Sequence, residues 1–254
     1  MKKTVLTIMS LAIIFIAFSQ SNENQVKNQG IVTYEEVIKF DIQLDNMSAV
    51  MQEMLPKENR SQKILYFNEN VSLYENFEQG DDAVIEDESE GGGVKIMISQ
   101  PDDIVFRDFK NEKIIEQKEF MTRVFLIESD SPKDEWKITG NQKMILDYPC
   151  QEATKQDGDS KVSVWFTPAI QIPAGPGEFG NLPGLILVVE SNNGDHSIMA
   201  KSIDLKEIDE KKLQKPKKGK KVSKEKFLSI VEEKNKEMGG ENSGGKTVIM
   251  KIQR

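Results

Sequence analysis

The sequence is a succession of short runs rich in valine, isoleucine, tyrosine and phenylalanine, separated by gaps too short to hold a helix. Such runs predict β-strands, and short gaps join antiparallel neighbours, because parallel strands need a crossover of a dozen residues or more. Turn signals stand at Asn68-Glu69-Asn70, Asp157-Gly158 and Asn193-Gly194. The expected strands span residues 31–44, 64–67, 71–74, 94–98, 104–109, 114–120, 124–127, 136–139, 143–148, 151–154, 162–166, 185–190, 197–203 and 246–252.

Two segments predict helices. Residues 45–54 are rich in methionine and end before Pro56, and residues 223–238 begin at Ser223, a favourable N-cap, and end before Gly239-Gly240. The fold class expected is therefore α+β. It is a predominantly antiparallel sheet, a meander able to curve into a half-barrel, with a short Met-rich helix and a C-terminal helix.

The first nineteen residues have the pattern of a signal peptide. Lys2 and Lys3 precede the apolar run Val5–Phe18, and Ala17-Phe18-Ser19 fits a small-residue cleavage site. The run is shorter than the ~20 residues of a membrane span, so we expect no transmembrane segment after cleavage. The alternative is a retained anchor or a buried helix. We expect residues 1–19 to be removed, residues 20–254 to form a single domain, and the protein to be secreted or periplasmic.

Composition excludes several classes of function. The chain of 254 residues has 34 Lys+Arg against 42 Asp+Glu, a net charge of −8, whereas a nucleic-acid binder needs a basic surface. With one histidine and one cysteine it can form no internal disulfide, and it lacks the ligands of a His/Cys zinc site. We therefore expect no nucleic-acid partner, no metal and no cofactor.

Two charged segments interrupt the strand pattern. An acidic loop, residues 75–93, carries eight acids but lacks the ligand spacing of a calcium loop, so a solvated loop is the preferred interpretation over a cation site. A lysine-rich segment, residues 206–226, carries ten lysines against four acids. It fits an exposed linker to the last helix, or contact with an anionic membrane or an acidic partner.

A proline- and glycine-rich loop before the run Leu185–Val189 is the candidate recognition loop. Its letters Gly175–Gly180 match G-x-G-x-x-G, but a strand follows where a dinucleotide site needs a helix. Prolines stiffen this loop, and glycines allow positive φ or close backbone approach, which fits recognition or packing rather than acid–base catalysis. The residues singled out are Pro173, Gly175, Pro176, Gly177, Phe179, Gly180, Leu182, Pro183 and Gly184.

Three methionines share one face of the Met-rich helix. Met47, Met51 and Met54 are spaced i, i+4, i+7, which fits an adaptable apolar groove or lid better than a copper site. Cys150 is expected to be a small buried residue, and His196 a solvent-exposed histidine after a turn.

Residues Gly180-Asn181-Leu182-Pro183-Gly184-Leu185-Ile186 resemble the signature of the GLPGLI family of exported proteins from Gram-negative bacteria, with Asn181 as a departure. The resemblance extends over nearly the whole mature chain. It includes residues 65–67, 72–74, 136–138, 148–153, 164–168, 170–173 and 175–176. It implies a secreted or periplasmic protein with no enzyme activity, and it carries no catalytic residues over to this chain.

Two functions follow from these observations. The first is an exported, non-enzymatic binding module of the cell envelope, holding a lipid or other apolar ligand, or contacting an outer-membrane protein. The second is an exported hydrolase using carboxylates that sequence does not reveal. An apolar cleft walled by the methionine face would favour the first, and a polar cleft with convergent acids and Cys150 or His196 would favour the second.

Overall fold

The computed structural model describes residues 28–39, 57–77, 83–87, 94–99, 101–133, 135–158, 160–191, 194–240 and 246–251. The expected signal peptide, the Met-rich helix with Met47, Met51 and Met54, and much of the acidic loop lie outside the described residues.

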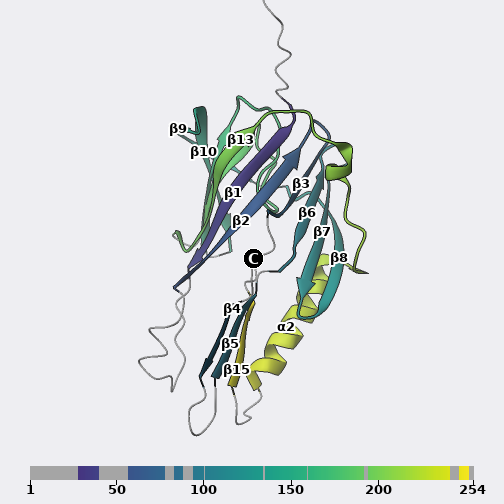
Figure 1. Cartoon of the computed structure of the whole chain (residues 1–254). Helices are drawn as coiled ribbons and strands as arrows, with labels where there is room; N and C mark the ends of the chain where they lie inside the picture. The colour runs from purple at the N-terminus through teal and green to yellow at the C-terminus, as the bar shows by residue number, and fades with distance from the viewer. Residues whose placement is uncertain are drawn as a thin grey trace, which may run out of the picture.

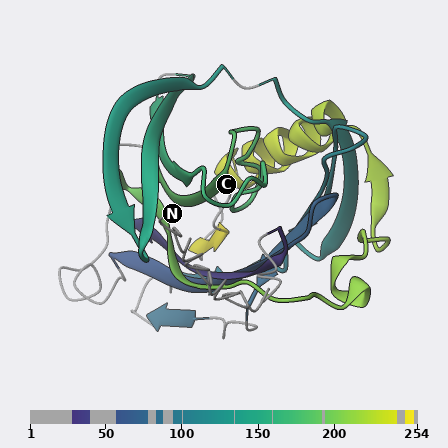
Figure 2. The ribbon, with the colours of Figure 1, turned by 90° about the horizontal axis from the view of Figure 1, so that it is seen from above.

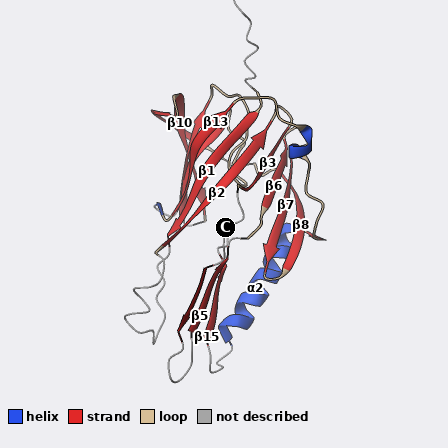
Figure 3. Cartoon of the chain, in the orientation of Figure 1, coloured by secondary structure: helices blue, strands red, loops and turns tan. Residues whose placement is uncertain are grey.

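Strands dominate the described part of the chain (Figures 1 and 3). The first eight are β1 (Gly30–Lys39), β2 (Glu58–Phe67), β3 (Val71–Asn76), β4 (Ala83–Asp87), β5 (Val94–Ser99), β6 (Ile104–Asp108), β7 (Lys113–Phe120) and β8 (Arg123–Asp130). There follow β9 (Lys137–Ile145), β10 (Tyr148–Asp157), β11 (Ser160–Thr167), β12 (Leu185–Ser191), β13 (His196–Asp204), the 3₁₀ helix η2 (Glu210–Leu213), β14 (Lys220–Val222), the helix α2 (Lys224–Gly240) and β15 (Lys246–Lys251).

The main sheet joins two meanders along one seam. Its order is β14-β8-β7-β6-β3-β2-β1-β13-β12-β11-β10-β9, so the chain leaves one end after β8 and re-enters at the other with β9. The seam is the antiparallel pairing of β1 with β13, in which Ile31 lies opposite Asp204. The predicted antiparallel sheet is thus confirmed, with two parallel exceptions, β14 beside β8 and β15 beside β5. The second pairing belongs to a separate sheet of order β15-β5-β4.

The main sheet is open and curved, with a concave and a convex face. Figure 2 shows its strands bent into an arc around the segment between β11 and β12. Side chains alternate between the faces: Val32 and Tyr34 of β1 point to the concave side and pack in the largest apolar cluster. Ile170, Ile172 and Leu182, from the segment inside the arc, belong to the same cluster, so this segment fills part of the concavity.

Smaller apolar clusters cover the convex face and one end of the concave face. On the convex face, Leu73 and Phe106 pack with Ile208 and Leu213, which flank or belong to η2. At the β8 end, Phe227 of α2 packs against inward-facing aromatic residues of β7 and β8, with ring centroids 6.3 Å from Phe120 and 5.4 Å from Phe125.

The C-terminal helix is confirmed and the lysine-rich segment differs from the prediction. Ser223 Oγ accepts a hydrogen bond from the Lys226 amide at 3.2 Å, which is the expected N-cap. The expected end before Gly239-Gly240 was wrong, because the helix includes both glycines. The segment 206–226 is not a simple linker, because it contains η2 and β14. The expected strands 136–139 and 143–148 are largely one strand, β9, in which Gly140 has φ +87° beside a register shift in β10. Within the described residues, no helix combines the length and apolar character that a bilayer crossing requires.

We predict that α2 is held mainly by Phe227. Replacing Phe227, which is 8 % exposed, by alanine leaves a cavity between the helix and β8 and should lower the free energy of unfolding by about 3 kcal/mol. The neighbouring Leu228 is 56 % exposed, and Leu228→Ala should change it by less than about 0.5 kcal/mol. Urea unfolding followed by circular dichroism measures both, and equal losses would contradict this packing.

Candidate functional site

The concave face changes from apolar to charged along several strands. Glu36 on β1 follows the inward-facing Val32 and Tyr34, and Lys63 on β2 precedes Leu65. Glu36, Lys63 and, on β7, Glu116 are each only 2 % exposed. Buried charges cost several kcal/mol unless they are paired, so charges at inward positions of regular strands are not explained by packing.

These charges are paired with one another and with neighbours. The two carboxylate oxygens of Glu36 are divided between partners: Oε1 lies 2.8 Å from His196 Nε2, and Oε2 lies 3.6 Å from Lys63 Nζ. Lys63 also donates to Asn76. On β7, Lys118 Nζ lies 2.9 Å from Glu116 Oε1. The strands therefore hold a fixed row of charges in the concavity.

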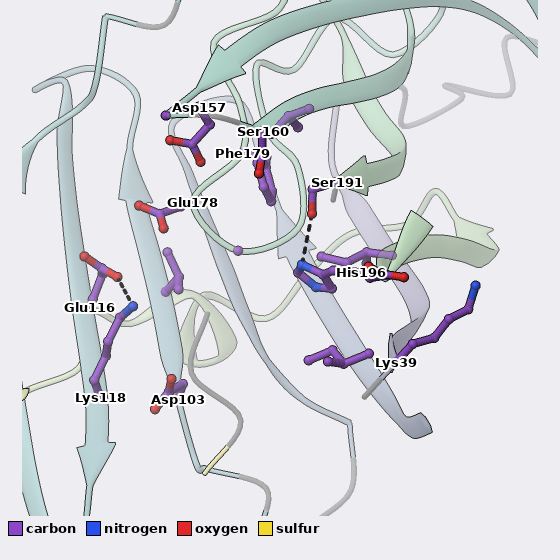
Figure 4. A pocket seen from close by; sticks show the side chains of 17 residues that line it. Lys39, Asp103, Glu116, Lys118, Asp157, Ser160, Glu178, Phe179, Ser191 and His196 are labelled. Atoms are coloured by element: carbon purple, nitrogen blue, oxygen red, sulfur yellow. Dashed lines mark hydrogen bonds and ion pairs between the residues drawn. The ribbon is translucent and has the colours of Figure 1, made fainter. Parts of the chain in front are cut away.

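Beside this row lies a cleft of about 390 Å³ (Figure 4). Charged, hydroxyl and apolar side chains all line it, and Val105, Val162 and Ile198 are its buried apolar members. The lining residues are Ile38, Lys39, Asp103, Val105, Glu116, Lys118, Asp157, Gly158, Ser160, Val162, Gly177, Glu178, Phe179, Ser191, Asp195, His196 and Ile198.

One wall of the cleft belongs to the recognition loop, which is clamped by Arg107. This side chain, from β6, is 2 % exposed. Its Nη1 donates to the carbonyl oxygen of Glu178 at 2.6 Å, and its Nη2 donates to Asn181 Oδ1 at 2.8 Å and to Ser131 Oγ at 3.2 Å. Because a guanidinium has several donors in a fixed plane, one side chain fixes two points of the loop relative to the sheet.

The loop glycines are explained by close approach, as predicted. A methyl group on Gly180 would lie 2.7 Å from Arg107 Cζ, and one on Gly184 would lie 2.2 Å from the Thr167 carbonyl oxygen. Gly177 has φ +59°, a conformation that favours glycine. Asn181, which interrupts the resemblance to GLPGLI, has φ +62°, and its Nδ2 donates to the Pro132 carbonyl oxygen at 2.7 Å. The amide side chain therefore takes part in the clamp.

Glu178 and Phe179 are residues of the loop that line the cleft. The Glu178 carboxylate lies 2.9 Å from Lys224 Nζ of α2. Burial opposes its charge, but Lys224, Lys118 and Lys155 together lower the pKa of Glu178 below its usual value, so it is ionised at neutral pH. Lys155 Nζ also lies over the Phe179 ring, 5.5 Å from its centroid.

The predicted recognition loop is thus only partly at the cleft. Among its singled-out residues, Gly177 and Phe179 line the cleft, and Pro173 lines a second hollow of about 340 Å³ together with Arg107 and Asn181. Pro183 is exposed away from both. The others, Gly175, Pro176, Gly180, Leu182 and Gly184, are buried and serve packing.

The prediction for His196 was wrong, and the one for Cys150 is confirmed. His196 is 18 % exposed and faces the cleft, because β13 pairs with β1 and brings the imidazole to the buried Glu36. Cys150 is buried in the main apolar cluster. Within the described ranges, no cluster of three or more histidine, cysteine or acidic side chains could hold a metal ion. Sequence reasoning missed Glu36, Lys63 and Glu116, whose one signal was a charge at an inward strand position.

The sequence matches the family described as N-glycanase peptide, N-terminal domain, over residues 62–228. The chain belongs to this family. Among solved structures, two of PNGF-II are similar: one in a P21 space group, with 17 % identity and a TM-score of 0.54 over 80 % of this chain, and one in C2, with 18 % identity and a TM-score of 0.55 over 80 %. The shared fold covers 33 % and 32 % of those chains, so this chain spans about a third of the length of PNGF-II.

Another solved structure is an uncharacterized conserved protein from Thermus thermophilus, with 8 % identity and a TM-score of 0.40, covering 80 % of this chain and 94 % of that one. Among curated proteins, none matches the chain in sequence. The resemblance to the GLPGLI signature stays a prediction.

We predict that Arg107 cannot be replaced by lysine. A lysine ammonium cannot reach Glu178, Asn181 and Ser131 together, so Arg107→Lys should lower the free energy of unfolding by about 2 kcal/mol or more. Arg60, which is 55 % exposed, is the matched control, and Arg60→Lys should cost less than about 0.5 kcal/mol. Chemical denaturation compares the two, and a tolerated Arg107→Lys would refute the clamp.

We also predict that Cys150 is inert in the folded protein. Burial raises the pKa of its thiol to about 11, and the residue is 1 % exposed, so little thiolate forms at pH 8 and reagents have no access. Ellman's reagent should report no free thiol in the native protein and one thiol per chain in guanidinium chloride. Rapid reaction of the native protein would show that this strand opens.

Proposed function

We propose that the chain is an exported binding module of the cell envelope whose cleft holds part of a carbohydrate chain. One observation carries the proposal: charged and hydroxyl side chains from strands and from the recognition loop surround a cleft that also contains apolar surface and the ring of Phe179. The membership in a family described by N-glycanase N-terminal domains supports a carbohydrate-related role.

Sugars match such a lining chemically. A sugar ring has hydroxyl groups on its edge and C–H groups on its faces, so it needs hydrogen-bond partners and an apolar platform in the same site. Glu116, Lys118 and Glu178 offer acceptors and donors from two walls, and Phe179 offers an aromatic side chain. A lipid, the apolar ligand expected from the sequence, fits this cleft less well than a sugar does. It would bury the charged side chains without pairing them.

Binding fits the acids of the cleft better than carboxylate catalysis does. A hydrolase using a carboxylate pair needs one acid that keeps its proton near neutral pH. The pKa of Glu178 is instead lowered by neighbouring lysines, and Glu116 is engaged by Lys118 at 2.9 Å. Glu178 therefore serves as a charged hydrogen-bond acceptor rather than as a proton donor, and Glu116 accepts from the Lys118 ammonium.

The proposal is tested by titrating the mature protein with purified neutral, N-acetylated and anionic oligosaccharides in a calorimeter. We expect micromolar to millimolar binding of at least one of them. Phe179→Ala should weaken it about tenfold, since aromatic stacking contributes on the order of 1 kcal/mol. Phe77, 44 % exposed and outside the cleft lining, provides the matched control, and Phe77→Ala should bind like the wild type. Failure to bind any oligosaccharide, or equal binding by Phe179→Ala, would remove the proposal.

A further inference from the structure

Three neighbouring strands place a serine, a histidine and a glutamate in one row on the concave face. In the order β1-β13-β12, Ser191 lies directly opposite His196, and His196 lies opposite Ile38, two residues beyond Glu36. Ser191 Oγ lies 3.4 Å from His196 Nδ1, as the dashed line in Figure 4 shows, and His196 Nε2 lies 2.8 Å from Glu36 Oε1. The geometry points to a serine acyl hydrolase site in this cleft.

The glutamate selects the form of histidine that a base requires. Because a carboxylate only accepts, the contact at Glu36 places the imidazole proton on Nε2. Nδ1 is then the lone-pair nitrogen, and it is the one that faces the serine hydroxyl. A nucleophile beside a base that a third group orients is the arrangement shared by hydrolases of unrelated folds. The two ring nitrogens exchange roles here, because in the Ser-His-Asp triad Nε2 faces the serine and Nδ1 faces the acid.

The third group is itself fixed and charged. Glu36 is 2 % exposed, and its other oxygen faces Lys63 Nζ at 3.6 Å and accepts from Ser61 Oγ at 3.4 Å. Glu36 stands within β1, whereas Ser191 is the last residue of β12 and His196 the first of β13, and the two are paired in the sheet. Sheet register therefore brings the three groups together, and catalysis requires groups that are positioned before substrate arrives.

The substrate class follows from the cleft and rests on the proposed function. Ser191 and His196 share a cleft of about 390 Å³ with the hydroxyl of Ser160 and the ring of Phe179. A sugar chain lying there would bring a small ester on one of its hydroxyls to the serine. We therefore assign O-acylated carbohydrates, acetyl esters above all, as the substrate class.

The reaction balances with water as co-reactant. Ser191 Oγ bonds to the ester carbonyl carbon while its proton passes to His196 Nδ1, and the ester C–O bond breaks as that proton moves to the leaving sugar oxygen. Water then bonds to the acyl carbon, giving one proton to His196. The bond from Ser191 Oγ to carbon breaks and the serine recovers the proton. The products are the free sugar hydroxyl and a carboxylic acid.

The test uses two probes that do not depend on sugar binding. The mature protein should hydrolyse p-nitrophenyl acetate above the buffer rate, and a fluorophosphonate should add covalently to the peptide containing Ser191, as mass spectrometry would show. Ser191→Ala should lose the label and at least about 100-fold of the rate. Ser197→Ala, on the adjoining strand position that faces the opposite side of the sheet, should keep both.

Glu36 is a positioning residue, so its variant is tested by separating kcat from KM. Glu36→Gln keeps the size of the side chain but removes the carboxylate that orients the imidazole. The kcat for p-nitrophenyl acetate should fall by at least about tenfold while KM changes by less than about twofold. An unchanged kcat in Glu36→Gln would contradict this role.

The outcomes separate the two proposals. No hydrolysis and no label on Ser191 in folded wild-type protein would overturn the acyl-hydrolase site, while oligosaccharide binding, measured separately, would leave the binding module in place. A rate retained by Ser191→Ala would also overturn it. Hydrolysis of the small ester without any oligosaccharide binding would keep the serine site and remove its carbohydrate substrate.

Discussion

The cleft wall depends on the hydrogen bonds that the buried guanidinium of Arg107 makes. Taking a charge out of water is expensive, and here the charge is held by hydrogen bonds to the Glu178 carbonyl, Asn181 and Ser131. The absence of a side chain at Gly180 leaves the room that this guanidinium occupies. The sheet and the loop therefore fit each other closely at this point. Glu178 and Phe179 face the cleft because Arg107 fixes this part of the loop relative to the sheet.

The concavity is divided into two halves with different physical roles. In one half, the apolar segment with Ile170, Ile172 and Leu182 packs on the sheet and supplies the hydrophobic burial that stabilises a curved open sheet. In the other half, Glu36, Lys63 and Glu116 occupy positions where apolar residues would be more stabilising. Local rules are most often broken at functional sites, so the charged half is where function is expected.

The sequence predicted features that depend on neighbouring residues, but not side-chain contacts between residues far apart in the chain. Alternation and turn residues located most strands, and Ser223 located the start of α2, because these features depend on neighbours in the chain. The prediction for His196 failed because its partner Glu36 is 160 residues away and meets it only through the seam. The role of Arg107 could not be predicted for the same reason, because its partner in the loop, Asn181, lies 74 residues further along the chain. The available signal was the inward spacing Val32-Tyr34-Glu36, which places a carboxylate where the strand pattern calls for an apolar residue.

The cleft draws its residues from both meanders, and this links function to folding. Glu116 and Lys118 come from β7 in the first meander, whereas Ser191 and His196 come from β12 and β13 in the second. The seam between β1 and β13 must form before these groups meet, and its closure joins segments far apart in sequence, which costs chain entropy. A ligand that contacts both sides binds only the closed sheet and stabilises it by mass action. The paired charges of Glu36, Lys63 and His196 can therefore lower the free energy of unfolding of the free protein. Ligand binding then offsets that cost, so the complex is still stable.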